Sequence, residues 1–254
     1  MMARIGYFLA LSVLSGIVFF DAGAGFGAPG PKFKGGGNKH NLSFSNTGVT
    51  YKASNASDPR GSQICIFCHT PHNAKPQTVL WNRNDTTQTF GHYSSNTLAI
   101  HTDETARTSS DYKAEPNGSS RLCLSCHDGV TALGAVLNGD AIEVNNSVGT
   151  VMAGAKVFDR AKITNSHHPV SFVYNAAVRD RLNVLEGANT YKLPANAKVR
   201  LDRDKRMQCI TCHDPHQTQF NDPSTPFWVL GGNSATEAHD AVCLDCHTFS
   251  SPDL

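Results

Sequence analysis

The spacing of the cysteines is the feature that most constrains this chain, because all eight of them fall into four Cys-x-x-Cys-His motifs. Two thiols at this spacing can add to the two vinyl groups of one haem, and the adjacent histidine is then held against the iron as its proximal ligand. The attachment residues are Cys65, Cys68, Cys123, Cys126, Cys209, Cys212, Cys243 and Cys246, and the proximal ligands are His69, His127, His213 and His247. The motifs therefore predict four haem c groups, each with one iron.

Disulfide bonds and zinc knuckles are two other common uses of paired cysteines. An exported chain with an even number of cysteines can be cross-linked, and Cys-x-x-Cys units can bind zinc. Neither use explains why a histidine follows each of the four units. The pattern favours haem attachment over both.

Each iron also needs a distal ligand unless it is catalytic. The chain has eight histidines outside the motifs and only 4 methionines. Because an axial methionine raises the potential, ligation by two histidines predicts low-potential, low-spin electron carriers. The favoured distal ligands are His40, His72, His168 and His216, and the weaker alternates are His167, His239, His92 and His101.

His72 and His216 stand in a special position, three residues after a motif histidine with a proline between. A distal ligand must approach the porphyrin from the opposite face, so neither residue suits the iron of its own motif. As a ligand, each would bind a second haem and bring two macrocycles close together. The alternative is a surface histidine after a proline turn. His168 precedes a proline, which favours extended backbone in a loop.

The composition predicts little regular structure. Hydrophobic residues make up 39% and aromatic residues 8% of the chain, which is thin for a conventional core, and long periodic segments are absent. We expect mostly irregular coil with short α-helices and few strands, organised by the haems of a multihaem cytochrome c. Short helices are expected around each motif and at 176–185 and 233–244, and a short strand at 170–174.

An imperfect internal duplication runs through the chain. The segment CIFCHTPH at 65–72 recurs as CITCHDPH at 209–216, and each copy is followed by a motif that begins Cys-Leu. Since no linker divides the copies, we expect one tetrahaem domain over 25–254, with motif pairs within 60–178 and 179–254.

The N-terminal segment has the layout of a secretory signal peptide, with Arg4, an apolar run over 5–20 and small residues that follow. Cleavage after Ala24 is expected, so residues 1–24 would be removed and the protein exported. A retained membrane anchor is the alternative, although the apolar run is shorter than a usual span of about 20 residues. The net charge of +1 gives no sign of nucleic-acid binding.

These motifs resemble the doubled Cys-x-x-Cys-His family of multihaem cytochromes c. Within it, the chain is most similar to the tetrahaem outer-surface cytochromes that polymerise into extracellular electron-conducting filaments. The similar segments are KHNLS at 39–43, CIFCHTPHNA with LWN within 65–82, CLSCHDG at 123–129, HPVSF at 168–172, CITCHDPH at 209–216 and CLDCH at 243–247.

The resemblance implies that every haem is ligated by two histidines and that stacked pairs of haems alternate with T-shaped contacts. It also implies a head-to-tail homopolymer in which one haem of each subunit takes its distal histidine from a neighbour. His40 is the candidate for this intersubunit ligand, because it follows a glycine-rich arm. Electron transport at the cell surface or in the extracellular space, with other redox proteins or extracellular electron acceptors as partners, would follow.

Two other functions remain open from the sequence. A soluble periplasmic tetrahaem shuttle would share the motifs without assembling. A multihaem reductase would need an open coordination position at one iron. Because all four motifs end in histidine and further histidines are abundant, we expect an electron carrier and not an enzyme.

Overall fold

The structure is a computed structural model that describes most of the chain beyond residue 37. The described residues are 38–74, 80–88, 90, 116, 118–145, 147, 149–154, 157–158, 168–217, 227–232 and 234–248. The predicted signal peptide, His92, His101 and His167 lie outside the described residues. In the part that is described, no helix has both the length and the apolar character needed to cross a membrane.

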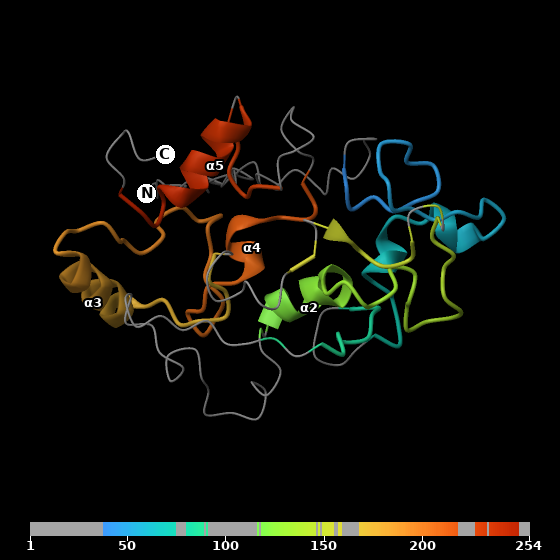
Figure 1. The fold of residues 1–254 in the computed structure, drawn as a ribbon, viewed down its shortest axis with the longest axis horizontal. Helices are drawn as coiled ribbons and strands as arrows, with labels where there is room; N and C mark the ends of the chain where they lie inside the picture. Colours follow the sequence, from blue (N-terminus) through green and yellow to red (C-terminus); the bar gives the residue numbers. More distant parts are fainter. Residues whose placement is uncertain are drawn as a thin grey trace, which may run out of the picture. The chain divides into compact units, whose positions relative to one another are not determined.

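Irregular coil dominates the described chain, and short helices are set into it (Figure 1). The helices are η1 (Pro59–Ser62), η2 (Cys65–Phe67), α2 (Gly118–His127), α3 (Ala176–Glu186), α4 (Cys209–Cys212) and α5 (Ala235–Cys243). The β-type pairing that is described consists of isolated bridges. The prediction of mostly coil with short helices is confirmed.

The helices expected at 176–185 and 233–244 correspond to α3 and α5, and both begin at side-chain caps. The Asn175 side chain accepts a hydrogen bond from the Val178 N–H at the start of α3, and Ser234 accepts one from Glu237 at the start of α5. Such caps satisfy backbone donors that the first turn of a helix leaves unpaired. Gly187 ends α3 in the left-handed region, with φ of 65°. Both helices are therefore confirmed, to within two residues of the expected bounds.

The strand expected at 170–174 is wrong. Ser171 has a φ of 66°, which interrupts an extended backbone, and only Val173 pairs, in an antiparallel bridge with Arg206. The apolar side chains of Phe172 and Tyr174 are nevertheless buried. They belong to a core and not to a sheet.

A turn of helix lies at or directly before each motif, as expected. In three motifs the histidine N–H donates to the carbonyl of the first cysteine. These bonds run from His69 to Cys65 (2.7 Å), from His213 to Cys209 (3.0 Å) and from His247 to Cys243 (2.9 Å). In the second motif, the histidine His127 is the last residue of α2. One turn thus places two thiols and an imidazole together in every motif.

Two small hydrophobic cores support the motifs. One contains Phe67 and Leu133, and Cys68 and Cys126 pack against it. The other contains Val242 and Cys246, and Cys212 packs against it. Each core therefore adjoins two motifs.

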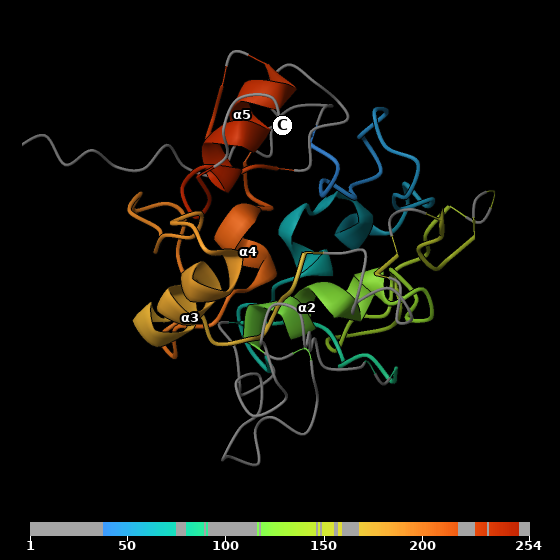
Figure 2. The same ribbon diagram turned by 60° about the vertical axis from the view of Figure 1, so that its left-hand side comes forward.

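Helices α2 and α4 lie side by side in both ribbon views (Figures 1 and 2). The Ser120 hydroxyl of α2 donates to Oε1 of Gln208 at 2.6 Å and accepts from the Cys209 N–H at 3.0 Å. Gln208 is 1% exposed. This buried network joins the second motif to the third.

Phe67 provides a test of the first core. It is 1% exposed, whereas Ile210, which occupies α4 in the second copy of the repeat, is 42% exposed. We expect Phe67→Ala to lower the free energy of unfolding by about 3–5 kcal/mol, because it leaves a cavity. Ile210→Ala should change it by no more than about 0.5 kcal/mol. Denaturant titration followed by circular dichroism measures both, and equal effects would contradict this account of the core.

Candidate haem-binding sites

The first and third motifs share a backbone arrangement that extends well beyond the repeated letters. In each, the motif histidine forms an antiparallel bridge with a tryptophan, and the residue before the tryptophan has a positive φ. The bridges are His69 with Trp81 and His213 with Trp228, and the positive φ values are 55° at Leu80 and 58° at Phe227. The flanking backbone hydrogen bonds match as well. The N–H groups of Thr70 and Asp214 donate to the carbonyls of Leu80 and Phe227, both at 2.8 Å. The N–H groups of Asn82 and Val229 donate to the carbonyls of Cys68 and Cys212, both at 2.9 Å.

The fourth motif repeats the arrangement with a tyrosine. His247 forms a bridge with Tyr191, and the ring centroids lie 5.3 Å apart. The Lys192 N–H donates to Cys246 at 2.9 Å, and the Thr248 N–H donates to Thr190 at 2.8 Å. Three motif histidines are thus held beside an aromatic ring by the same backbone pairing.

These aromatic residues were missed by the sequence reasoning as partners of the motif histidines. A signal existed for Trp81 and Trp228, which follow the two copies of the repeat at 12 and 15 residues after the histidine. None existed for Tyr191, which precedes its motif by a long segment. Trp228 stacks on His213 with centroids 4.8 Å apart, and Trp81 meets His69 edge-on at 5.6 Å. The rings restrict how each imidazole can turn.

The second motif is held differently, by α2 and the turn that follows it. The Phe158 N–H donates to the carbonyl of His127 at 2.8 Å. The Asp128 carboxylate accepts from the N–H groups of Val130 (3.0 Å) and Thr131 (2.8 Å). Burial alone would raise the pKa of Asp128, but hydrogen bonds led by those from Thr131 lower it. An ionised carboxylate therefore stands next to this motif.

Three motif histidines lie beside a second imidazole that the sequence marked as a distal candidate. The pairs, with centroid distances and interplanar angles, are His40 with His127 (6.1 Å, 76°), His216 with His69 (6.1 Å, 22°) and His168 with His247 (6.5 Å, 77°). The structure thus places His216, which follows the third motif, beside His69 of the first motif. All three pairs join segments that are far apart in the sequence.

His40 is enclosed within its own chain. Its ring stacks on Phe227 with centroids 4.5 Å apart, and its Nδ1 is buried with no hydrogen-bond partner among the described residues. Burial lowers the pKa of His40 to about 3, and the nearby His127 adds to this effect. In this placement His40 lies beside a motif imidazole of its own chain, and its role as a ligand between subunits stays a prediction. A neutral imidazole with an unused nitrogen is suited to bind a metal.

The electrostatic surroundings of the His168–His247 pair favour neutral imidazoles. Burial lowers the pKa of His168, and this outweighs the opposing effect of the Pro169 carbonyl, which lies 2.9 Å from Nδ1. Burial lowers the pKa of His247 too, and His168 contributes. Both rings therefore keep the lone pair that a metal ligand needs.

The remaining described candidates lie apart from these pairs. His72 is exposed, but its backbone is fixed, since its carbonyl accepts from Thr70 Oγ1 at 2.9 Å and from Asn138 Nδ2 at 2.7 Å. His239 lies edge-on to Trp228 at 5.3 Å, and its Nδ1 lies 2.9 Å from Asp240. Its Nε2 is 3.6 Å from the thiol of Cys243, the first cysteine of the fourth motif.

The thiols of different motifs also approach one another. Cys123 and Cys209 share a hydrogen bond, which raises the pKa of Cys123 and lowers that of Cys209. Burial, together with the neighbouring Cys126, raises the pKa of Cys68 to about 12. Attachment points of the first and second motifs, and of the second and third, are therefore adjacent.

The third and fourth motifs are linked in the same way. Burial raises the pKa of Cys212 to about 12, and Cys246 and Cys243 of the fourth motif add to the shift. Burial also raises the pKa of Cys246 to about 12. Both thiols therefore favour the protonated form at neutral pH.

Neither a disulfide nor a group of metal-ligating side chains is present among the described residues. None of the eight cysteines, all of which are described, forms a disulfide. A structural zinc ion takes four ligands, and the described residues contain no group of three or more His, Cys, Asp or Glu side chains that could hold a metal ion. Three of the motif histidines instead lie beside a second imidazole.

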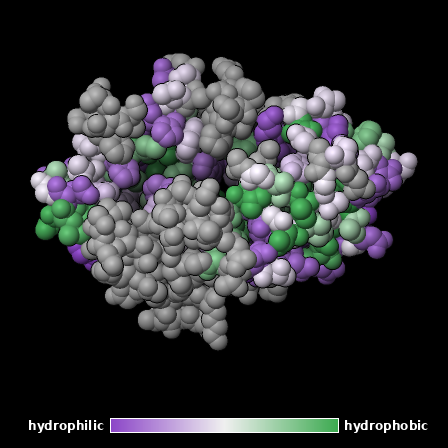
Figure 3. All heavy atoms as spheres, in the orientation of Figure 1, coloured by the Kyte–Doolittle hydropathy of each residue, from purple (hydrophilic) through white to green (hydrophobic). Residues whose placement is uncertain are grey.

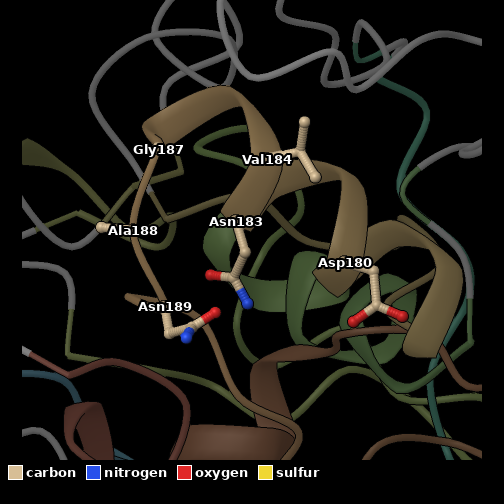
Figure 4. Close-up of a pocket in the computed structure, with 6 residues that line it drawn as sticks. All are labelled: Asp180, Asn183, Val184, Gly187, Ala188 and Asn189. Carbon is tan, nitrogen blue, oxygen red and sulfur yellow. The ribbon is translucent and has the colours of Figure 1, made fainter.

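A surface depression at the end of α3, with a volume of about 440 Å³, lies apart from the motifs (Figure 4). It is lined by Asp180, Asn183, Val184, Gly187, Ala188 and Asn189. Asn183 exchanges two hydrogen bonds with the backbone of Tyr191, at 2.9 and 2.8 Å. Asn183 thus positions Tyr191, the residue that packs on His247.

Comparison with known proteins finds no protein-family model that matches the chain, and no curated protein matches it. The motifs and their geometry are therefore the basis for a function.

Proposed function

We propose that the protein carries four covalently attached haem c groups and transfers electrons between them. The observation that carries this proposal is the pairing of motif histidines with a second imidazole, at centroid distances of 6.1 to 6.5 Å. Two metal–nitrogen bonds of about 2 Å, with the radius of an imidazole ring on each side, place the centroids about 6 Å apart. The spacing suits one iron between each pair of rings.

The surroundings of the motifs also suit a porphyrin. Leu80 and Val130 are 44 and 46% exposed, and each lies beside a motif. Figure 3 shows apolar side chains gathered on the right-hand half of one face. Apolar side chains beside a thioether link and an axial histidine can pack against the faces of a macrocycle.

Haem iron supplies reversible one-electron chemistry, and this chain's residues determine where that chemistry occurs. The cysteines would attach each group, the imidazoles of the three histidine pairs would ligate the iron, and the aromatic rings restrict how the motif histidines can turn. Because thiols of successive motifs are neighbours, the four groups would form one closely spaced series. Filled axial positions favour electron transfer over catalysis.

Haem stoichiometry tests this proposal directly. Protein produced with a c-type maturation system should contain four haems per chain by the pyridine haemochrome assay and by intact mass. Cys209→Ser with Cys212→Ser should contain three. A wild-type protein that binds zinc or forms disulfides in place of haem would overturn the proposal.

We further propose that His72 of one subunit is a distal ligand in the next subunit of an extracellular filament. In the folded chain, His216 follows the third motif and meets His69 of the first motif. His72 holds the equivalent position after the first motif and is exposed on a fixed backbone. An equivalent contact from His72 to His213 of a second copy would be head-to-tail, and a contact of that kind that does not close builds an open polymer.

A soluble periplasmic shuttle is the second candidate function, and the exposed His72 ring is the observation that favours it. In a shuttle this ring would stay in solvent and every subunit would remain separate. The state of assembly of the secreted protein distinguishes the two functions. A multihaem reductase is less well supported, because three described motif histidines already face a second imidazole.

A further inference from the structure

Arg83 is a fully buried cation that lies between the first two motifs. It is 0% exposed, and its guanidinium makes hydrogen bonds only to backbone carbonyls. The acceptors are Ser125 (3.2 Å from Nε and 2.9 Å from Nη2), Leu133 (2.6 Å), Ala132 (2.8 Å) and Phe67 (3.5 Å). No described carboxylate lies within ion-pair distance of Arg83. Backbone carbonyl dipoles therefore stabilise the positive charge of Arg83, and no described carboxylate neutralises it.

The hydrogen-bond partners place this charge beside two haem attachment loops. Phe67 lies between the two cysteines of the first motif, and Ser125 lies between those of the second. The guanidinium therefore lies against the backbone of both attachment loops. Because this site is buried, solvent and salt screen the charge weakly.

The internal repeat shows that the cation is specific to the first copy. Asn82 and Val229 make equivalent bonds to the second cysteine of their motifs, so the residues that follow them, Arg83 and Leu230, are equivalent. Leu230 packs against the second hydrophobic core. One copy thus has a buried positive charge where the other has an apolar side chain.

We infer that Arg83 raises the reduction potentials of the haems of the first two motifs, an inference that rests on the proposed function. Reduction adds one electron to the iron and removes one unit of positive charge, so a buried cation favours the reduced state. Asp128 opposes this effect at the second motif, because it directly follows His127 and its carboxylate is held there by the N–H groups of Val130 and Thr131. The haem attached at Cys65 and Cys68 is therefore the one most affected.

Arg83 also has a structural role, because it donates hydrogen bonds to backbone carbonyls at and beyond the end of α2. The test must therefore separate the effect of these hydrogen bonds from the effect of the charge. Arg83→Leu copies the residue of the second repeat and removes the charge. Arg83→Lys keeps the charge but loses most of the five hydrogen bonds. Arg60→Leu is the control, since it removes a partly exposed cation that is paired with Asp58 at 2.9 Å.

The measurement is a haem-resolved redox titration by NMR, made after the haems per chain have been counted. Fewer than four haems in the wild type would refute the proposed function itself. With four haems, we expect Arg83→Leu to shift two midpoint potentials to more negative values, the first haem most, while Arg83→Lys and Arg60→Leu stay near the wild type. The inference would be overturned if the titration curves of Arg83→Leu superimposed on those of the wild type. It would also be overturned if Arg83→Lys shifted the potentials as much as Arg83→Leu.

The wild type provides a second measurement if Arg83→Leu does not accumulate with four haems. The haem attached at Cys65 and Cys68 should then be reduced before the haem attached at Cys123 and Cys126, where Asp128 lies. The reverse order would refute the role of Arg83.

Discussion

His40→Ala should convert one of the four haems from a low-spin to a high-spin state while the other three stay low-spin. The ring of His40 lies 6.1 Å from His127 in the same chain, with a buried Nδ1 that has no hydrogen-bond partner among the described residues. Removing it leaves the iron at His127 without its distal imidazole. Electron paramagnetic resonance and magnetic circular dichroism of the oxidised protein measure the change.

His239→Ala is the matched control for this prediction. His239 is also a histidine near a motif, but its ring faces Trp228 and Asp240 and not a motif imidazole. All four haems should stay low-spin in this variant. Four low-spin haems in His40→Ala, or a high-spin haem in His239→Ala alone, would show that the ligand pairs are assigned incorrectly.

His72→Ala should abolish filaments and leave one high-spin haem per chain. Its exposed ring, on a backbone fixed by Thr70 and Asn138, is the proposed link to the next subunit. Loss of that link removes an axial ligand and the contact between subunits in a single step. Electron microscopy and sedimentation of the secreted protein measure assembly, and spectroscopy counts the high-spin haems.

His40→Ala is the natural comparison, because it should lose a distal ligand and still form filaments. If His40 instead joined the subunits, His40→Ala would be the variant that fails to assemble. Normal filaments in His72→Ala would refute the proposed link. A wild-type protein that stays monomeric with four low-spin haems would favour the shuttle.

The local parts of this protein could be predicted from the sequence because they depend on residues close together in the chain. Two cysteines and a histidine within five positions need only one turn of backbone, and the structure places such a turn at or just before every motif. The shortage of apolar residues likewise indicated mostly coil. The strand expected at 170–174 failed because Ser171 adopts a positive φ that no local pattern announced.

The partners of the motif histidines could not be predicted in the same way. The sequence narrowed the distal candidates to four, but a count of histidines does not say which rings meet. His40 was expected to reach outward on the evidence of its glycine-rich arm, yet it stacks on Phe227 inside its own chain. That contact depends on the packing of two segments near opposite ends of the sequence.

The sequence by itself determined the chemistry of the four motifs, since thiol and imidazole spacing is a local property. Only the tertiary structure decided which imidazoles face each other, which aromatic rings flank the motif histidines, and where the buried charge of Arg83 lies. The physical reason is that these contacts join distant segments, whose meeting depends on the burial of side chains in two small cores. The four Cys-x-x-Cys-His motifs define where the proposed haems would attach, and long-range packing sets the surroundings in which they would exchange electrons.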